Sequence, residues 1–174
     1  MLEYVTVRIF ISPYFYLIGV LLGLVMGIIC RKQGFTRMRS FASGLLAAYM
    51  FLVIATTLLS REISDNYHYK FQLFWSWQAI QDGRVAVLGE KIFNVIMFIP
   101  IGLLWPFVFR MKFLPSFVLG ILFSVSIELL QLIFKCGLFE FDDIVMNSLG
   151  MLIGLCVMAL CILFRPADKL PPRH

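Results

Sequence analysis

The residues of this sequence best suited to chemistry are carboxylates and amides placed inside apolar runs between residues 124 and 154. Glu128 and Gln131 interrupt one such run, and Asp143 and Asn147 open the next. Moving an ionised side chain into hydrocarbon costs at least ~2.5 kcal/mol, so we expect Glu128 to have a function. Carboxylate and amide oxygens suit acid/base chemistry, a divalent cation held by oxygen ligands, or a pocket for a polar head group.

The spacing of these residues predicts two helices whose polar stripes face each other. Residues at i, i+4, i+7 and i+11 share one face of an α-helix, and this spacing relates Asp143, Asn147, Gly150 and Gly154. A second stripe with similar spacing contains Ser124, Glu128, Gln131 and Lys135. A short turn at residues 136–142 would bring the two stripes together.

Asp142 and Asp143 precede the apolar residues of the second helix, and two interpretations of them are open. An acidic residue at a helix start can cap the first N–H groups, which stabilises the helix by about 1 kcal/mol. Alternatively, these carboxylates act directly, as cation ligands or together with Glu128. Two interpretations are also open for Asn147 and Gln131, which either bind a ligand or form hydrogen bonds between helices.

The composition of the chain identifies the class of protein that holds these residues. Of its 174 residues, 61% are hydrophobic and 14% are charged, and the mean hydropathy is +0.92. These values are typical of an integral membrane protein. The net charge of +5 does not indicate nucleic-acid binding, because nine of the fifteen cations lie in three short segments beside apolar runs. That distribution is typical of cytoplasmic loops and tails.

We therefore predict an all-α, polytopic membrane protein with one domain over residues 1–174. Five transmembrane helices are expected at residues 13–30, 41–59, 92–109, 113–134 and 144–164, each long enough for a hydrocarbon core of ~30 Å. Residues 1–10 should lie at the membrane interface. The first span should be retained, because no basic cluster precedes it and no small-residue cleavage site follows it. The cations predict an N-terminus outside the cell and a cytoplasmic C-terminus.

This orientation places the candidate site at the outer leaflet. Asn94 lies at the outer end of the third span, Glu128 near the outer end of the fourth, and Asp142 at the outer end of the fifth. Cys136 is then the one cysteine expected outside, where a reagent in the medium should reach it, and no disulfide framework is expected. With only His68 and His174 in the chain, a histidine-based metal site is not expected either.

Two further patterns predict packing and surface properties. Gly19, Gly23 and Gly27 recur every four residues, so a neighbouring helix should approach them closely, and we expect Gly150 and Gly154 to serve helix packing as well. The segment 60–91 is rich in aromatic residues, among them Trp75 and Trp77. We expect a short interfacial helix or a re-entrant piece there, which either anchors the chain in the head-group layer or binds a lipid or amphiphile.

The chemistry-bearing residues stand in motifs that resemble the VanZ-like family of bacterial membrane proteins. The motifs are Glu90-Lys91-Ile92-Phe93-Asn94 with MFIPIG after it, Glu128-Leu-Leu-Gln131, and Asp142-Asp143-Ile-Val-Met-Asn147-Ser-Leu-Gly150 followed by Gly154. The resemblance covers about residues 85–160. It implies roles for Asn94, Glu128, Gln131, Asp143, Asn147 and Gly150. Many family members carry a basic residue, usually Arg, just before the acidic turn. Here Gly137 and Leu138 stand at that place, and Lys135 is the nearest cation in sequence.

The resemblance implies a cell-envelope protein of Gram-positive bacteria that gives tolerance to teicoplanin, a lipid-bearing glycopeptide. We expect the outer-leaflet site to recognise a membrane lipid, a lipid-linked wall precursor or such an antibiotic. The alternative is a membrane enzyme that modifies such a molecule, with Glu128 as acid/base, Asp143 assisting, and a divalent cation bound by Asp142 and Asp143. An ion or proton pathway ranks third, because the inner halves of the spans offer few polar residues.

Overall fold

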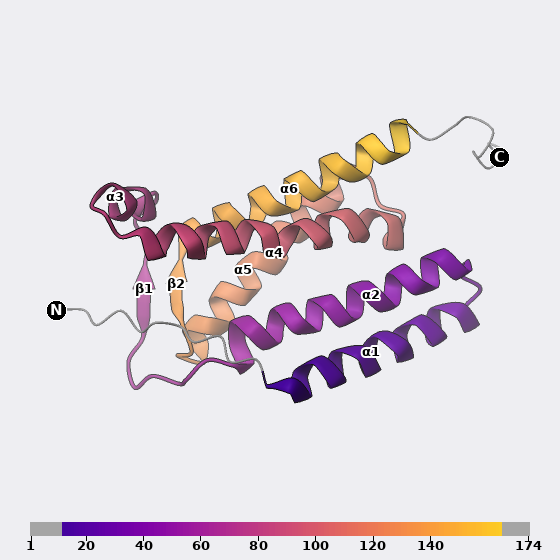
Figure 1. Cartoon of the computed structure of the whole chain (residues 1–174), viewed down its shortest axis with the longest axis horizontal. Coiled ribbons are helices and arrows are strands. Elements are labelled where there is room, and N and C mark those ends of the chain that lie inside the picture. Colours follow the sequence, from indigo (N-terminus) through magenta and orange to yellow (C-terminus); the bar gives the residue numbers. More distant parts are fainter. Residues whose placement is uncertain (1–11, 165–174) are drawn as a thin grey trace.

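The structure is a computed structural model that describes residues 12–164, and five long helices dominate it (Figure 1). These helices are α1 (Pro13–Lys32), α2 (Arg37–Ile54), α4 (Val85–Phe109), α5 (Phe113–Ile133) and α6 (Phe141–Leu163). A π-helical turn, η1 (Ala55–Leu59), continues α2. The expectations for residues 1–10 and for the cations at Arg165, Lys169 and Arg173 lie outside the described residues.

Each long helix, with η1 counted as part of the second, is long and apolar enough to cross a membrane. The prediction of an all-α protein with five spans is therefore confirmed, and the chain is a multi-pass membrane protein. Several helices begin earlier than predicted, and the largest difference is in α4, which begins at Val85 rather than at residue 92. This difference brings Glu90 and Lys91 inside a helix.

Glycines allow the closest approaches between helices. A Cβ atom added at Gly23 of α1 would lie 2.7 Å from the carbonyl oxygen of Gly44 in α2. Where α6 crosses α4, a Cβ at Gly150 would collide with the carbonyl oxygen of Val95, and one at Gly154 with that of Ile99. Backbones at this separation exclude any larger side chain, as in other close helix pairs in membranes.

Two of the turns between helices lie at one end of the bundle, and the strands and the short helix lie at the other end. Residues 33–36 join α1 to α2 and residues 110–112 join α4 to α5, and both turns lie at the right of Figure 1. The opposite end carries the helix α3 (Trp75–Gln81) and the strands β1 (His68–Lys70) and β2 (Leu138–Glu140). We refer to it below as the polar end.

The two strands form a small parallel sheet that the sequence analysis did not predict. Tyr69 pairs with Phe139 and Lys70 with Glu140. The segment 60–91 therefore holds a strand, a short helix and the first turns of α4, instead of a single interfacial element. The predicted turn at 136–142 is wrong in the same way, since α5 ends at Ile133, β2 follows, and α6 already begins at Phe141.

Candidate functional site

Lys91 is the centre of a buried ion cluster at the polar end. The residue is 4% exposed, and its ammonium group donates to the carboxylates of Glu140 and Asp143. Lys91 comes from α4, Glu140 from the end of β2 and Asp143 from the first turn of α6, so three elements meet at one side chain. A cation buried at this depth is tolerated only because these charges compensate it. We call Lys91, Glu128, Glu140 and Asp143 the ion cluster.

Glu140 is held from both its side chain and its backbone. Its Oε2 also accepts a hydrogen bond from the indole N–H of Trp75 at 3.1 Å. Burial and the nearby charge of Asp143 raise the pKa of Glu140 from its ordinary value, although Lys91 opposes them. The indole of Trp75 is 5% exposed and lies below the ammonium of Lys70, which is 3.7 Å from the ring centroid. Trp75 therefore closes the cluster on the side of β1.

Glu128 connects α5 to the cluster through the backbone. Its side chain is 2% exposed, and its Oε2 accepts a hydrogen bond of 3.1 Å from the backbone N–H of Glu140. The cation of the cluster is Lys91, which pairs with Glu140 and Asp143. Lys135, which was expected on the same stripe, lies beyond the end of α5, and its ammonium donates to the carbonyl of Asp65.

Asp142 caps a helix other than its own. Its Oδ1 accepts from the backbone N–H of Phe74 at 2.6 Å, and its Oδ2 accepts from both the N–H, at 2.9 Å, and the hydroxyl of Ser76. These donors belong to the start of α3, where Phe74 has a left-handed φ of 59°. Of the two interpretations of Asp142, capping of the last helix is not seen, because α6 begins with Glu140 at its N-cap position and no side chain caps it.

Amide side chains continue the polar surface into the bundle. Gln131 donates to the carbonyl oxygen of Thr57 at 3.1 Å, and Asn147 donates to the hydroxyl of Ser124 at 2.9 Å. The amide oxygens of Gln131 and Asn147 are both buried and have no hydrogen-bond partner among residues 12–164. Buried acceptors of this kind are uncommon, so they are available to a ligand or to water.

The polar surface ends below Asn147. The next residues on the facing surfaces of α4 and α6 are fully buried and apolar, and they are Phe98, Ile101, Met151 and Leu155. Together they fill the middle of the bundle with hydrocarbon. This buried polar surface is thus confined to the part of the bundle next to the polar end.

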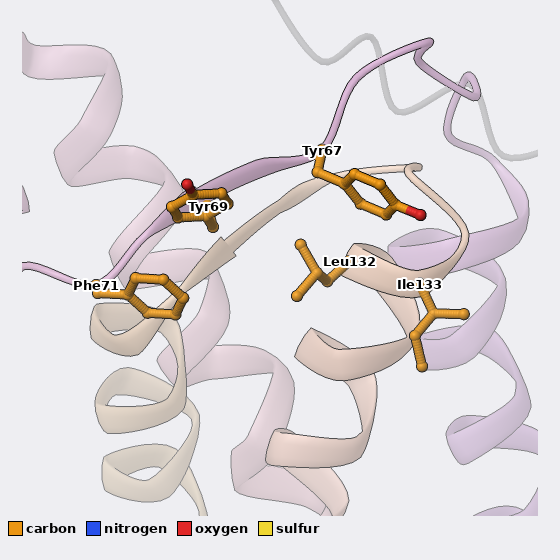
Figure 2. Close-up of a pocket in the computed structure, with 5 residues that line it drawn as sticks. All are labelled: Tyr67, Tyr69, Phe71, Leu132 and Ile133. Atoms are coloured by element: carbon orange, nitrogen blue, oxygen red, sulfur yellow. The ribbon is translucent and has the colours of Figure 1, made fainter.

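An apolar groove of about 420 Å³ lies beside the ion cluster at the polar end. Figure 2 shows its walls, which are Tyr67, Tyr69 and Phe71 on one side and Leu132 and Ile133 at the end of α5 on the other. The ring of Phe71 packs against Phe139 of β2, with centroids 5.6 Å apart. Strand β2 therefore separates the groove from the ion cluster, since Phe139 packs toward the groove and Glu140 belongs to the cluster.

The structure brings most of the predicted site residues together. Glu128, Asp143 and Trp75 take part in the ion cluster or contact it. Gln131 lies one turn after Glu128 in α5, and Asn147 lies one turn after Asp143 in α6 and donates to Ser124. Asn94 lies one turn along α4 from Lys91 and is half-buried. Trp77, in contrast, is 63% exposed.

Two cations were missed or misplaced by the sequence analysis. Lys91 was assigned to the loop because the third span was expected to begin at Ile92. Arg61 was not singled out, although its guanidinium lies against Gly137, where a Cβ atom would be 2.7 Å from its Nη1. The signal for Lys91 was present, since an ionisable residue at the edge of an apolar run has the same significance as Glu128.

Cys136 is less accessible than the sequence predicted. It is 5% exposed, and burial raises the pKa of its thiol. A maleimide reacts with the thiolate, so Cys136 should react slowly whichever side of the membrane it faces.

A site for a divalent cation was also considered from the sequence. Within residues 12–164 no three His, Cys, Asp or Glu side chains are arranged to hold a metal ion. Asp142 is engaged by the start of α3 and Asp143 by Lys91, so a cation shared by these two aspartates would have to displace those partners.

Comparisons with known proteins agree with the motifs. The sequence model of the VanZ/LLP1 family matches residues 15–164. A relative described as Protein VanZ, from Enterococcus faecium, is 33% identical over 122 residues, which are 67% of this chain and 73% of the relative. No solved structure matches the chain.

Proposed function

Because the chain belongs to the VanZ/LLP1 family, we propose that it gives its bacterium tolerance to teicoplanin-type lipoglycopeptides. It does so through the polar end, which recognises a membrane lipid, a lipid-linked wall precursor or the amphiphilic antibiotic itself. The observation that carries this proposal is the pairing of a buried ion cluster with an apolar groove at the same end of the bundle. An amphiphile presents the matching combination of a polar head and a hydrocarbon chain.

The polar end faces the cell exterior in this proposal. The turn after α1 and the start of α2 carry Arg31, Lys32, Arg37 and Arg39, and the turn after α4 carries Arg110 and Lys112. These cations all lie at the end opposite to the ion cluster. Cations next to short loops remain on the cytoplasmic side, so the cluster and the groove belong to the outer leaflet.

A labelling experiment tests this orientation. Asp82→Cys, at a side chain that is 70% exposed near α3, should react with a membrane-impermeant maleimide on intact cells. Gln33→Cys, in the exposed turn after α1, should react only after the cells are permeabilised. Wild-type protein measures the background from the four native cysteines. Labelling of the Gln33→Cys protein on intact cells would place the polar end in the cytoplasm and overturn the proposed site.

The role of the ion cluster is tested at Glu128. Glu128→Gln keeps the side-chain volume and an oxygen that can accept from the N–H of Glu140, but removes the charge. We expect the protein to fold and insert, while the inhibitory concentration of teicoplanin falls to that of cells without the protein. Cells that produce equal amounts of each variant should be compared, with Glu62→Gln as the exposed control at the same end.

Tolerance that is unchanged by Glu128→Gln would make Glu128 a structural residue and remove the acid/base role from consideration. The alternative function, a membrane enzyme with Glu128 as acid/base, stays a prediction that the Glu128→Gln variant also tests. If a divalent cation raises the unfolding temperature of wild-type protein and leaves that of the Glu128→Gln variant unchanged, a cation-assisted reaction becomes the better account of the site.

A further inference from the structure

Arg61 has a charge that nothing in the described chain pairs. It lies two residues beyond η1, and its Nε is buried without a hydrogen-bond partner among residues 12–164. No carboxylate of these residues forms an ion pair with it, although Glu90 and Glu128 lie close enough to interact electrostatically. A guanidinium offers five N–H donors in a fixed plane, and burying one of them without an acceptor is unfavourable.

Gly137 lies directly against this guanidinium and against the amide of Gln131. A Cβ atom at position 137 would lie 2.7 Å from Nη1 of Arg61 and 3.2 Å from the amide oxygen of Gln131. That oxygen is the unpartnered acceptor described above, and its direction is fixed because the amide nitrogen of Gln131 donates to Thr57. A donor fork and an acceptor therefore both lie close to a residue without a side chain.

The neighbouring surface is apolar with a cationic rim. Leu132 and Ile133, which follow Gln131 on α5, form one wall of the groove in Figure 2, and Tyr67 forms part of the other. The ammonium of Lys135 lies 4.6 Å from the centroid of the Tyr67 ring. A ligand in this groove would thus have its hydrocarbon part against α5 and a cation close to its polar part.

Phosphate is the group that fits these features. Its oxygens accept paired hydrogen bonds from a guanidinium, and a P–OH or a neighbouring hydroxyl can donate to an amide oxygen. The carboxylates behind Arg61 already have partners in Lys91, in the start of α3 and in the N–H of Glu140. Arg61 is the side chain of this region whose donors remain unused.

We propose that Arg61 and Gln131 bind the phosphate head group of an amphiphile whose hydrocarbon chain occupies the groove between Tyr67 and Ile133. This inference rests on the amphiphile site proposed above and names the chemistry of its head group. Glu90 and Glu128 repel an anion, so a free phosphate should bind more weakly than one that is also held by its chain.

The proposal is tested by isothermal titration calorimetry of the purified full chain in neutral maltoside micelles. The three titrants are inorganic phosphate, dihexanoylphosphatidic acid and the uncharged dihexanoylglycerol. We expect phosphatidic acid to bind wild-type protein and to bind Arg61→Gln about tenfold to hundredfold more weakly, as is usual for the loss of a charged hydrogen bond. Arg37→Gln removes the same charge at the other end of α2, at an exposed position, and should bind like wild type.

Gly137→Ala is a second variant that retains every charge. The added methyl group would lie too close to Nη1 of Arg61 and displace the guanidinium, and φ at this position is not left-handed, so the backbone accepts alanine. Binding of phosphatidic acid should weaken in this variant too, and it decides the question if Arg61→Gln protein fails to fold. Equal binding of inorganic phosphate and phosphatidic acid would identify a free-phosphate site with the same chemistry.

The proposal is overturned if dihexanoylglycerol binds as tightly as phosphatidic acid, or if both variants bind like wild type. These measurements need no antibiotic. If phosphatidic acid does not bind but cells remain tolerant to teicoplanin, the phosphate site is wrong and the proposed function stands. If phosphatidic acid binds but the protein gives no tolerance, the proposed function is wrong and the phosphate site stands.

Discussion

Lys91→Met should destabilise the protein by about 3–5 kcal/mol, since removing one partner of a buried ion pair leaves the other charges without compensation. Glu140 and Asp143 would both lose the ammonium group, and neither is exposed enough to recover its solvation from water. Methionine matches the length of lysine, so the loss of charge rather than of packing volume dominates. Yield by fluorescence-detected gel filtration and the unfolding temperature in detergent measure the effect.

The control and the rescue separate charge from packing. Lys112→Met changes an exposed lysine at the other end of the bundle and should leave the unfolding temperature unchanged. Adding Glu140→Gln and Asp143→Asn to the Lys91→Met protein removes the uncompensated charges and should restore much of the lost stability. If Lys91→Met alone unfolds at the wild-type temperature, the ion cluster contributes nothing to the fold and its residues are held in place by other contacts.

Asp142→Asn should destabilise the polar end by about 1–3 kcal/mol, which is the cost of one buried donor left without an acceptor. Asparagine is usually an adequate substitute for aspartate at a helix cap. Here, however, each carboxylate oxygen accepts from a different backbone N–H, one of Phe74 and one of Ser76. The amide nitrogen of asparagine must face one of those donors, so one hydrogen bond is lost and replaced by repulsion.

Asp142→Ala should be more damaging still, because it leaves both N–H groups unpaired. Hydrogen exchange of residues 74–81 locates the effect, which should be concentrated in α3 and spread little into α1 and α2. Asp82→Asn is the matched control, with a side chain that is 70% exposed. A mild Asp142→Asn together with a severe Asp142→Ala would mean that a single acceptor suffices, and that the start of α3 rearranges around it.

The sequence predicted the membrane spans well because they carry a strong periodic and compositional signal. Glu128, Asp143 and Asn147 were also predicted to be neighbours, since i, i+4 spacing within two adjacent helices determines which faces meet. Strand β2 could not be predicted, because three residues are too few to show an alternating pattern. Its absence from the prediction explains why Glu140 was placed in a turn rather than beside Lys91.

Contacts between segments that are distant in the sequence could not be predicted from the spacing of residues within a helix. Asp142 caps a helix 66 residues earlier in the chain, whereas a local cap was the natural expectation from its neighbours. Lys135 was extrapolated along a helical stripe, but α5 stops at Ile133 and Lys135 adopts a left-handed φ of 54°. The chain has left the helix at Lys135, so its long side chain reaches another partner.

Arg61 bears on the one departure from the family pattern. The position where many members carry a basic residue is occupied here by Gly137 and Leu138. The guanidinium of Arg61 reaches Gly137 from the end of the second span, so a positive charge is present in the same region although it comes from another helix. The absence of a side chain at Gly137 is what leaves room for it.

The ion cluster also has a consequence for how the protein is made. The ribosome synthesises the chain from its N-terminus, so Lys91 enters the membrane region before Glu140 and Asp143 have been polymerised. During that interval the third span carries a cation for which the bilayer offers no partner. Its final position becomes favourable only when the last span arrives and delivers both carboxylates. We therefore expect a chain that lacks its last helix to keep an unmatched lysine and to be less stable in the membrane than the full chain.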